Sequence, residues 1–256
     1  MKKIALVLVL FMYISFNMLY ASSSYKIGNI NIRIFEDSAS EREPHFIKGL
    51  SPEIAANFKN IKIKMHVNVL LASVDGKNYL FDVGYGRNAI KDMALNGINP
   101  DDIDAIFISH LHGDHIDGLV VDGKRTFTNA KVYINEDELN FWTSDKNIND
   151  ANYSELSSRF VNVKNKLQPY LSDIITFTVD DKLTHLNEIV PHISPVNLKG
   201  HTPGHMGYII SDGDDKLFFI GDLYHYLGIQ LHSADVYTTF DIDSKKAIET
   251  RTNILE

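Results

Sequence analysis

The feature that most constrains the fold is a dense run of polar side chains placed directly after an apolar segment. Residues 109–118 read Ser-His-Leu-His-Gly-Asp-His-Ile-Asp-Gly and follow residues 103–108, which are apolar except for Asp104. Such an apolar run predicts a buried strand, and a loop at the end of a strand is held in place by a rigid scaffold. We therefore expect a functional site where this strand ends.

Four side chains of this loop have the chemistry and the spacing of metal ligands. His110 and His112 are two residues apart, so in extended chain they point to the same side and can share one metal ion. Gly113 allows a sharp turn, after which Asp114 and His115 can face a second ion nearby. Imidazole nitrogens and carboxylate oxygens are the ligands that zinc accepts in open catalytic sites. The loop therefore predicts a metal centre.

Two later segments also end an apolar strand with polar side chains. The first is Gly-His-Thr-Pro-Gly-His at 200–205, and the second places Asp222 after the apolar run 217–220. A carboxylate at the end of a core strand is costly unless it is paired or bound, so Asp222 is expected to ligate. For His205 we favour a packed or hydrogen-bonding role. Asp82, which ends an earlier strand, is expected either to cap a turn or to hold the ligands in place.

The alternation of strand and helix patterns indicates the fold class. Strands are expected at 25–35, 60–73, 78–83, 103–109, 131–135, 174–179, 196–200, 206–211 and 217–220. Helices are expected within 84–95 and at 136–142, 154–167 and 244–255. Hairpins early in the chain and crossovers later indicate an α/β (α+β) protein with two sheets packed face to face and helices outside. Because no linker or repeat divides residues 25–256, we expect one domain with a four-layer αββα sandwich.

The N-terminus has the layout of a secretory signal peptide. Lys2 and Lys3 precede an apolar run at 4–20, and small residues follow from Ala21. We expect residues 1–21 to be removed, which predicts a secreted or periplasmic protein without a membrane anchor. The alternative is an uncleaved anchor, since a run of roughly 17 residues is long enough for a marginal span. The sequence contains no cysteine, which excludes disulfides and a lipid-modified cysteine.

The charge balance argues against nucleic acid as a partner. The formal net charge is −8, and loss of the two lysines with residues 1–21 would make it −10. An acidic surface repels phosphates, and no basic stripe with interleaved aromatic residues occurs. We expect a small-molecule substrate, whereas the oligomeric state stays open.

With these motifs, the chain resembles the metallo-β-lactamase superfamily, whose members share the αββα sandwich and a His-x-His-x-Asp-His motif. The resemblance implies two Zn²⁺ ions per chain. It assigns His110, His112 and His201 to one ion, Asp114 and His115 to the other, and Asp222 to a bridging position. It also implies hydrolysis by a metal-bound hydroxide, because bound zinc lowers the pKa of water to about 7. Asp114 is then also the catalytic residue that orients the nucleophile or carries a proton to the leaving group.

One departure from the family pattern concerns the second ion. Family members supply a further histidine from a segment after the helix that 244–255 matches, whereas this chain ends at Glu256. We therefore expect the last C-terminal strand and that ligand to be missing, and we favour a truncated product. Alternatively His225 or His232 replaces the ligand, or the second ion is loosely held.

The motifs leave the substrate class open among esters, lactones, phosphotriesters and amides. The 200–205 run and the Phe-Asp-x-Asp segment 240–243 are similar to lactonase-type and general hydrolase branches. Lactonases of this type place a tyrosine a few residues after the bridging aspartate, where this chain has His225. The pattern around His225, with Phe127, Asn129 and Trp142, is similar to methyl parathion hydrolases. A β-lactamase and a non-catalytic metal-binding protein are the remaining alternatives.

Overall fold

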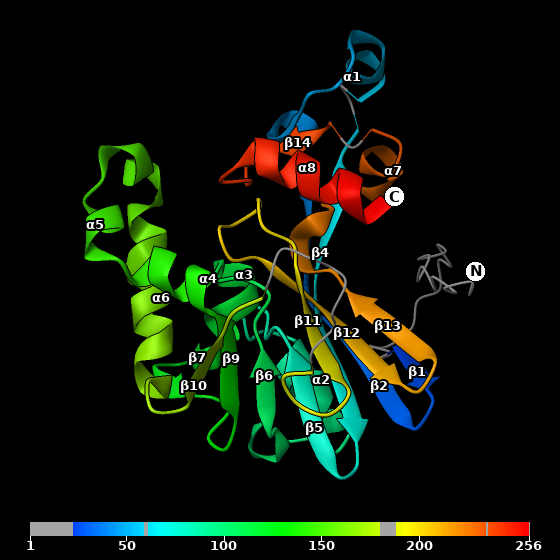
Figure 1. Ribbon diagram of the computed structural model, residues 1–256, viewed down its shortest axis with the longest axis vertical. Coiled ribbons are helices and arrows are strands. Elements are labelled where there is room, and N and C mark those ends of the chain that lie inside the picture. The colour runs from blue at the N-terminus through cyan, green and yellow to red at the C-terminus, as the bar shows by residue number, and fades with distance from the viewer. Residues whose placement is uncertain (1–22, 59–60, 180–187, 234, 256) are drawn as a thin grey trace.

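The computed structural model describes residues 23–58, 61–179, 188–233 and 235–255 (Figure 1). The predicted signal peptide, residues 1–21, lies outside these ranges. Among the described residues, no helix has the length and apolar character needed to cross a membrane.

The larger sheet has seven strands in the order β1-β2-β4-β5-β6-β9-β10. Their bounds are β1 (Ser23–Ile27), β2 (Ile30–Arg42), β4 (Ile63–Val74), β5 (Lys77–Phe81), β6 (Ala105–Phe107), β9 (Lys131–Asn135) and β10 (Ile174–Phe177). The pairs from β1 to β5 are antiparallel, and those from β5 to β10 are parallel. The sheet is therefore mixed, with hairpins in its first half and crossovers in its second.

A smaller antiparallel sheet packs against one face of the larger one. It contains β11 (Ile193–Asn197), β12 (Met206–Asp212) and β13 (Asp215–Phe219). Alternate residues of β4 point to opposite faces. Leu70 and Ala72 pack with Tyr208 and Ile210 of β12, whereas Leu71 joins a separate core on the helical side. The two faces of one strand thus belong to two hydrophobic cores.

Helices cover the outer face of the larger sheet, and one helix contacts the smaller sheet. The larger sheet packs against α2 (Ala89–Leu95), α4 (Glu136–Thr143) and α6 (Ser157–Leu167), which contribute Met93, Trp142 and Phe160 to its core. The smaller sheet packs against α8 (Ser244–Leu255), whose Ile254 contacts the cluster around Val196. In Figure 1, α8 lies beside β14 (Tyr237–Thr238) and α7 (Leu227–Gln230) at the end of the molecule where the strands of the smaller sheet finish. The predicted α/β sandwich of two sheets packed face to face is therefore confirmed for the described residues.

Shorter elements cluster at the end of the sandwich where the polar motifs lie. They include α3 (Gly113–Ile116), α7 (Leu227–Gln230), and the pair β3 (Ile47–Lys48) and β14 (Tyr237–Thr238). Away from this group lie α5 (Asp145–Ile148) and the pair β7 (Val120–Val121) and β8 (Lys124–Arg125). The helix α1 (Pro52–Phe58) projects at one end of the molecule (Figure 1). These pieces shape the edge of the sandwich.

The first predicted strand is wrong in its extent. Residues 25–35 are not one strand, because the chain reverses between Ile27 and Ile30 to pair β1 with β2. Gly28 there adopts a φ of +52°, which glycine reaches without steric cost. The predicted helix 244–255 coincides with α8, and a strand missing after it stays a prediction.

Candidate metal centre

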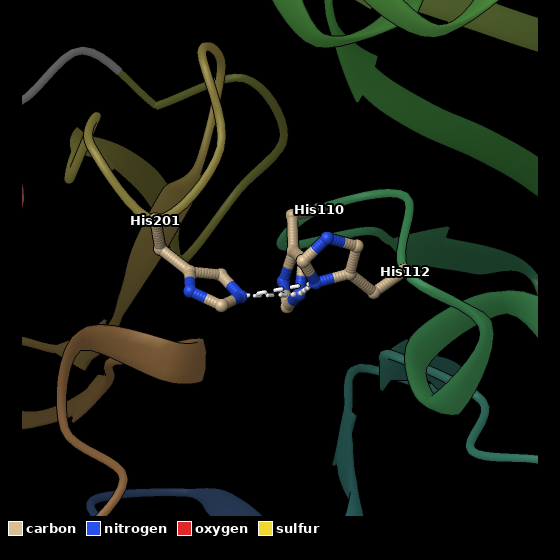
Figure 2. A group of neighbouring side chains, drawn as sticks. All are labelled: His110, His112 and His201. Atoms are coloured by element: carbon tan, nitrogen blue, oxygen red, sulfur yellow. Dashed lines mark hydrogen bonds between the residues drawn. The ribbon is translucent and has the colours of Figure 1, made fainter. Parts of the chain in front are cut away.

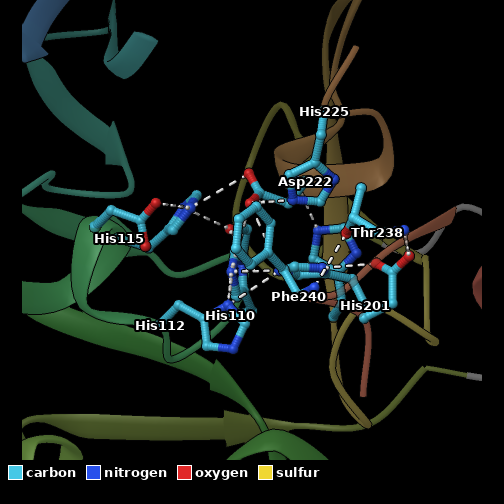
Figure 3. A network of polar contacts seen from close by, with 12 residues as sticks. His110, His112, His115, His201, Asp222, His225, Thr238 and Phe240 are labelled. Carbon is cyan, nitrogen blue, oxygen red and sulfur yellow. Dashed lines mark hydrogen bonds and ion pairs between the residues drawn. The ribbon is translucent and has the colours of Figure 1, made fainter. Parts of the chain in front are cut away.

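The motif side chains converge at one edge of the sandwich (Figure 3). His110 and His112 follow β6, and α3 carries Asp114 and His115. His201 lies in the loop between β11 and β12, and Asp222 lies in the 3-10 turn Gly221–Leu223 after β13. Segments from both sheets therefore supply the site, as the strand-end pattern predicts.

Three histidine nitrogens meet at one point (Figure 2). His110 Nε2 lies 3.0 Å from His112 Nδ1 and 3.2 Å from His201 Nε2, and the last two atoms are 3.0 Å apart. All three side chains belong to buried residues. The converging atoms lie close enough together to ligate a single ion.

In His110 and His201, the nitrogen that faces away from the other rings forms a hydrogen bond. These hydrogen bonds determine which nitrogen of each ring carries the lone pair. His201 Nδ1 lies 3.0 Å from Asp241 Oδ1, and because a carboxylate only accepts, Nδ1 carries the proton. His110 Nδ1 lies 3.0 Å from Ser109 Oγ, whose own hydrogen is donated to Asp82 Oδ2 at 2.7 Å. Nδ1 of His110 is therefore the donor, and the Nε2 atoms of His110 and His201 carry lone pairs.

Burial keeps this cluster neutral. Burial, followed by neighbouring rings, lowers the pKa of His110 and His112 well below the usual 6.5. Burial also lowers the pKa of His201, although Asp241 and Asp222 oppose the shift. Neutral imidazoles with converging lone pairs are the donor set that zinc takes in catalytic sites. The residues present therefore fit the ion that the family resemblance implies.

A second group lies beside the first and is rich in acids. His115 Nε2 is 3.3 Å from Asp222 Oδ1 and 3.7 Å from Asp114 Oδ2. His115 Nδ1 donates to Asp82 Oδ2 at 2.7 Å, so Asp82 holds a ligand-type ring in place. Burial alone would lower the pKa of His115, but Asp222, Asp82 and Asp114 together raise it well above 6.5.

Asp222 lies between the two groups. Its Oδ2 is 3.5 Å from His201 Nε2 and 4.0 Å from His110 Nε2, while its Oδ1 faces His115. Burial would raise the pKa of this carboxyl, yet His115 and His225 hold it well below 3.8. Gly221 adopts a φ of +51°, and a Cβ there would lie 2.5 Å from His205 Nε2. The turn that presents Asp222 therefore requires glycine.

The described residues contain three groups in which ligand-type atoms lie within 4.8 Å of one another. They are His110, His112 and His201; His110, His115 and Asp222; and His201, Asp222 and His225. Asp114 belongs to none of them, and its side chain is 36% exposed. Of the predicted ligands, five therefore meet closely, and Asp114 stands at the edge.

The remaining histidines differ in environment. His205 is buried, donates from Nδ1 to Leu198 O at 3.0 Å and accepts at Nε2 from Asp222 N at 3.1 Å. Burial lowers its pKa to about 3, which agrees with the expected hydrogen-bonding role. His225 lies against Asp222 and His201, with Nε2 3.2 Å from Asp222 Oδ2. His225 is therefore not grouped with His115. His232 is exposed and belongs to none of the three groups.

Sequence reasoning missed the residue that joins the two histidine loops. Glu138 in α4 is 1% exposed and accepts hydrogen bonds from Leu111 N at 2.8 Å, Gly204 N at 2.9 Å and Trp142 Nε1 at 2.8 Å. Leu111 stands between His110 and His112, and Gly204 belongs to the His201 loop. The only sequence signal was an acid placed four residues before a tryptophan on a helix, a spacing that puts both on one face.

Two further buried acids were also missed. Asp241 holds His201 and lies 3.9 Å from the guanidinium of Arg251, which is itself buried. Asp37, at the bulge of β2, accepts from the backbone nitrogens of Tyr85 and Arg87 at 2.8 and 2.7 Å. Asp37 thereby fixes a loop beside the centre.

Most of the residues that carry the resemblance to methyl parathion hydrolases have structural roles. Phe127 and Trp142 are fully buried in the core under the helices. Asn129 donates to Asp101 O at 2.8 Å on the surface. Only Trp142 contacts the centre, because its ring centroid is 5.5 Å from that of His112.

Comparison with known proteins agrees with the motif and the geometry. The hydrolase AbOPH, described as belonging to the β-lactamase superfamily, is 25% identical over 93% of this chain and 86% of its own, with a TM-score of 0.82. AidC, a dizinc quorum-quenching lactonase solved with the product N-hexanoyl-L-homoserine, is 28% identical over 92% of this chain and 86% of its own, with a TM-score of 0.79.

A sequence relative and a family model complete the comparison. Ribonuclease Z of Methanothermobacter thermautotrophicus is 45% identical over 58 residues, which are 23% of this chain and 18% of that protein. The chain thus spans about a fifth of the length of this relative. The model of the metallo-β-lactamase superfamily matches residues 64–254, a range that holds both histidine loops, Asp222 and most of α8. Together with the two packed sheets and the histidine cluster, this match shows that the chain belongs to the metallo-β-lactamase superfamily.

Proposed function

We propose that the chain is a zinc-dependent hydrolase that opens an ester or lactone bond. The observation that carries this proposal is the convergence of three buried, neutral histidine nitrogens beside a carboxylate and a second histidine group. The likeness to a dizinc lactonase over most of both chains supports the substrate class. The short match to a ribonuclease does not extend to the larger part of either protein.

The proposed ligand sets follow the geometry. His110, His112 and His201 would hold the first ion through Nε2, Nδ1 and Nε2. His115, Asp114 and Asp222 would hold the second, with Asp222 facing both. When bound, the ions would polarise the scissile carbonyl and make a water molecule acidic near neutral pH.

The protein's own groups would position the reactants and move the proton. Asp241 and Ser109 fix the ring orientations of His201 and His110, so their lone pairs are already directed inward. Asp114 has the exposed carboxylate at the edge of the centre. It would therefore accept a proton from the nucleophile and deliver it to the leaving alkoxide.

The location and partners of the protein complete the proposal. Export through removal of residues 1–21 would place the enzyme in the periplasm or outside the cell, where it would meet small-molecule substrates. N-terminal sequencing of the mature protein tests this point. A mature chain that starts near residue 22 is expected, and an intact Met1 in exported protein would contradict it.

The activity is tested by a hydrolysis screen with zinc-loaded protein. Lactones and simple esters are expected to be hydrolysed faster than phosphotriesters, β-lactams and thioesters. His110→Ala should abolish turnover, because His110 belongs to two of the ligand groups. His66→Gln is the matched control, since His66 lies in β4 and pairs with Glu36. Preferred cleavage of β-lactams would replace the lactonase proposal with the β-lactamase alternative.

Metal analysis separates the enzyme from a non-catalytic binding protein. About two zinc ions per native chain are expected. Fewer than one ion per chain, with no turnover of any substrate in the screen, would favour the non-catalytic alternative.

A further inference from the structure

Arg159 brings a positive charge to the rim of the metal centre. It lies in the first turn of α6, is exposed, and places Nη1 3.3 Å from His112 Nε2. Nε2 is the outer nitrogen of the His112 ring, because Nδ1 faces the other two histidines. The chain has a formal net charge of −8, so a cation at this position is not part of a generally basic surface.

The protonation of His112 decides what Arg159 can bind. In the described arrangement, His112 Nδ1 can donate to the bare Nε2 atoms of His110 and His201, and Nε2 then accepts from Arg159. When Nδ1 ligates a metal ion, the single proton of the neutral ring resides on Nε2. Arg159 has no acceptor atom, so two donors then face each other. An oxygen acceptor placed between them would satisfy both donors.

Two more arginines stand on the side of the centre formed by β2 and the following loops. The Arg87 guanidinium lies 4.5 Å from the Tyr85 ring centroid, and that of Arg42 lies 5.7 Å from the Phe240 ring centroid. Phe240 is 5.5 Å from the ring of His225, which reaches His201 and Asp222. Both arginines are exposed, so each adds one positive charge on this side of the centre.

Tyr85 places these arginines near the reacting groups. Burial, followed by Asp114, raises the pKa of the Tyr85 phenol, whereas Arg42 and Arg87 oppose that shift. The phenol is therefore within electrostatic reach of Asp114 and of both cations. Asp37 fixes the backbone of Tyr85 and Arg87, so this part of the rim is held in place before any ligand binds.

We propose that the Arg159 guanidinium and the Nε2–H of His112 form an oxyanion subsite that binds a carboxylate of the substrate. The favoured substrate is then an ester or lactone that carries a carboxylate away from the scissile bond. Guanidinium and carboxylate groups form short, charge-assisted hydrogen bonds that fix orientation as well as affinity. This inference rests on the proposed function because it assumes that the centre holds zinc. Its binding test, however, does not require turnover.

Binding is measured with hexanoate and its neutral counterpart hexanamide on zinc-loaded protein. Trp142 is the single tryptophan of the chain, and its ring lies 5.5 Å from that of His112, so its emission reports on this region. Calorimetry gives the same affinities without a fluorescent reporter. We expect hexanoate to bind at least about tenfold more tightly than hexanamide, as a charged hydrogen bond allows.

The variant Arg159→Gln should remove most of this preference. Arg33→Gln is the matched control, because it removes one positive charge from a guanidinium that donates to Asn96 O at 3.4 Å. A carboxylate that binds zinc alone would keep its affinity in Arg159→Gln. Equal hexanoate affinity in the wild type and Arg159→Gln, or no binding of hexanoate, would overturn the subsite.

Kinetics with a matched pair of esters separates this inference from the proposed function. The pair is a p-nitrophenyl ester that ends in a carboxylate and the same ester capped as a methyl ester. Arg159→Gln should lower kcat/KM for the acid about tenfold or more relative to kcat/KM for the methyl ester. No turnover by the wild type, with Arg159-dependent hexanoate binding intact, counts against the esterase proposal and supports the subsite. Turnover with an unchanged ratio counts against the subsite alone.

Discussion

The two halves of the metal centre are built differently. The three-histidine half is buried and neutral, and the outer nitrogens of two rings are held by Ser109 and Asp241. The acid-rich half contains Asp114 with a 36% exposed side chain and Asp222 with a 24% exposed side chain. His115 in that half is engaged with three carboxylates.

This difference concerns the organisation of each half before metal arrives. In the first half, the lone pairs of His110 and His201 already point inward, so ligation requires only that the proton of His112 move from Nδ1 to Nε2. In the second half, a cation must compete with the ion pairs of His115 and order a carboxylate at the edge. We therefore expect the first ion to bind more tightly than the second.

The largest effect is expected for His110→Ala. His110 Nε2 belongs both to the three-histidine group and to the group with His115 and Asp222. Its loss should reduce zinc affinity at the first position by more than about 100-fold, beyond the range for loss of a partner of a ligand. Zinc content after dialysis, measured by atomic emission, is expected to fall below one ion per chain. Retention of two ions would refute the shared role of His110.

Asp222→Asn should affect the two halves unequally. The amide keeps the size of the side chain but removes the charge that faces His115. Zinc content should fall from about two ions to about one, because the three histidines still converge without Asp222. Cobalt substitution checks this result, since the visible spectrum of the remaining ion reports nitrogen ligation. Loss of both ions would contradict the independence of the first half.

Asp241→Asn tests the support behind His201. The amide oxygen can still accept from His201 Nδ1, but the charge that strengthens this hydrogen bond is removed. Affinity for the first ion should fall about tenfold, at the low end for changes to partners of metal ligands. Competition with a chelator measures this affinity. Asp243→Asn is the control, because Asp243 accepts from Lys246 N at the start of α8. An equal loss in both variants would mean that the effect is structural.

Glu138→Gln should have the smallest effect on metal binding and a clear effect on stability. An amide nitrogen would face either Gly204 N or the two donors Leu111 N and Trp142 Nε1, so a buried donor loses its acceptor. The free energy of unfolding of the metal-free protein should fall by about 1 to 3 kcal/mol. Urea unfolding followed by Trp142 emission measures this change. A variant as stable as the wild type would show that the two loops do not depend on this carboxylate.

The sequence predicts the parts of the centre whose signal is local. His110 and His112 are two residues apart after an apolar strand, and Asp222 follows another such run after one glycine, so local pattern places each at a strand end. The layers follow in the same way from alternating apolar residues, as in β4, where Leu70 and Leu71 enter different cores. The hairpin at Gly28 was missed although a glycine there is a turn signal.

The supporting residues depend on contacts distant in sequence. Asp241 is 40 residues from His201, and Arg159 is 47 residues from His112. Glu138 reaches Gly204 over 66 residues. No periodicity encodes such pairings, because tertiary packing decides which buried donors an acid meets. The same holds for His225, which packs against His201 and Asp222 rather than with His115.

Stepwise zinc titration of the metal-free full chain tests the central claim most directly. Competition with a chromophoric chelator gives the two dissociation constants. We predict two phases, with the tighter one lost in His110→Ala and retained in Asp222→Asn. A tight phase that survives His110→Ala, or two ions that bind with equal affinity and are lost together in Asp222→Asn, would contradict the account of a preorganised three-histidine half beside a weaker acid-rich half.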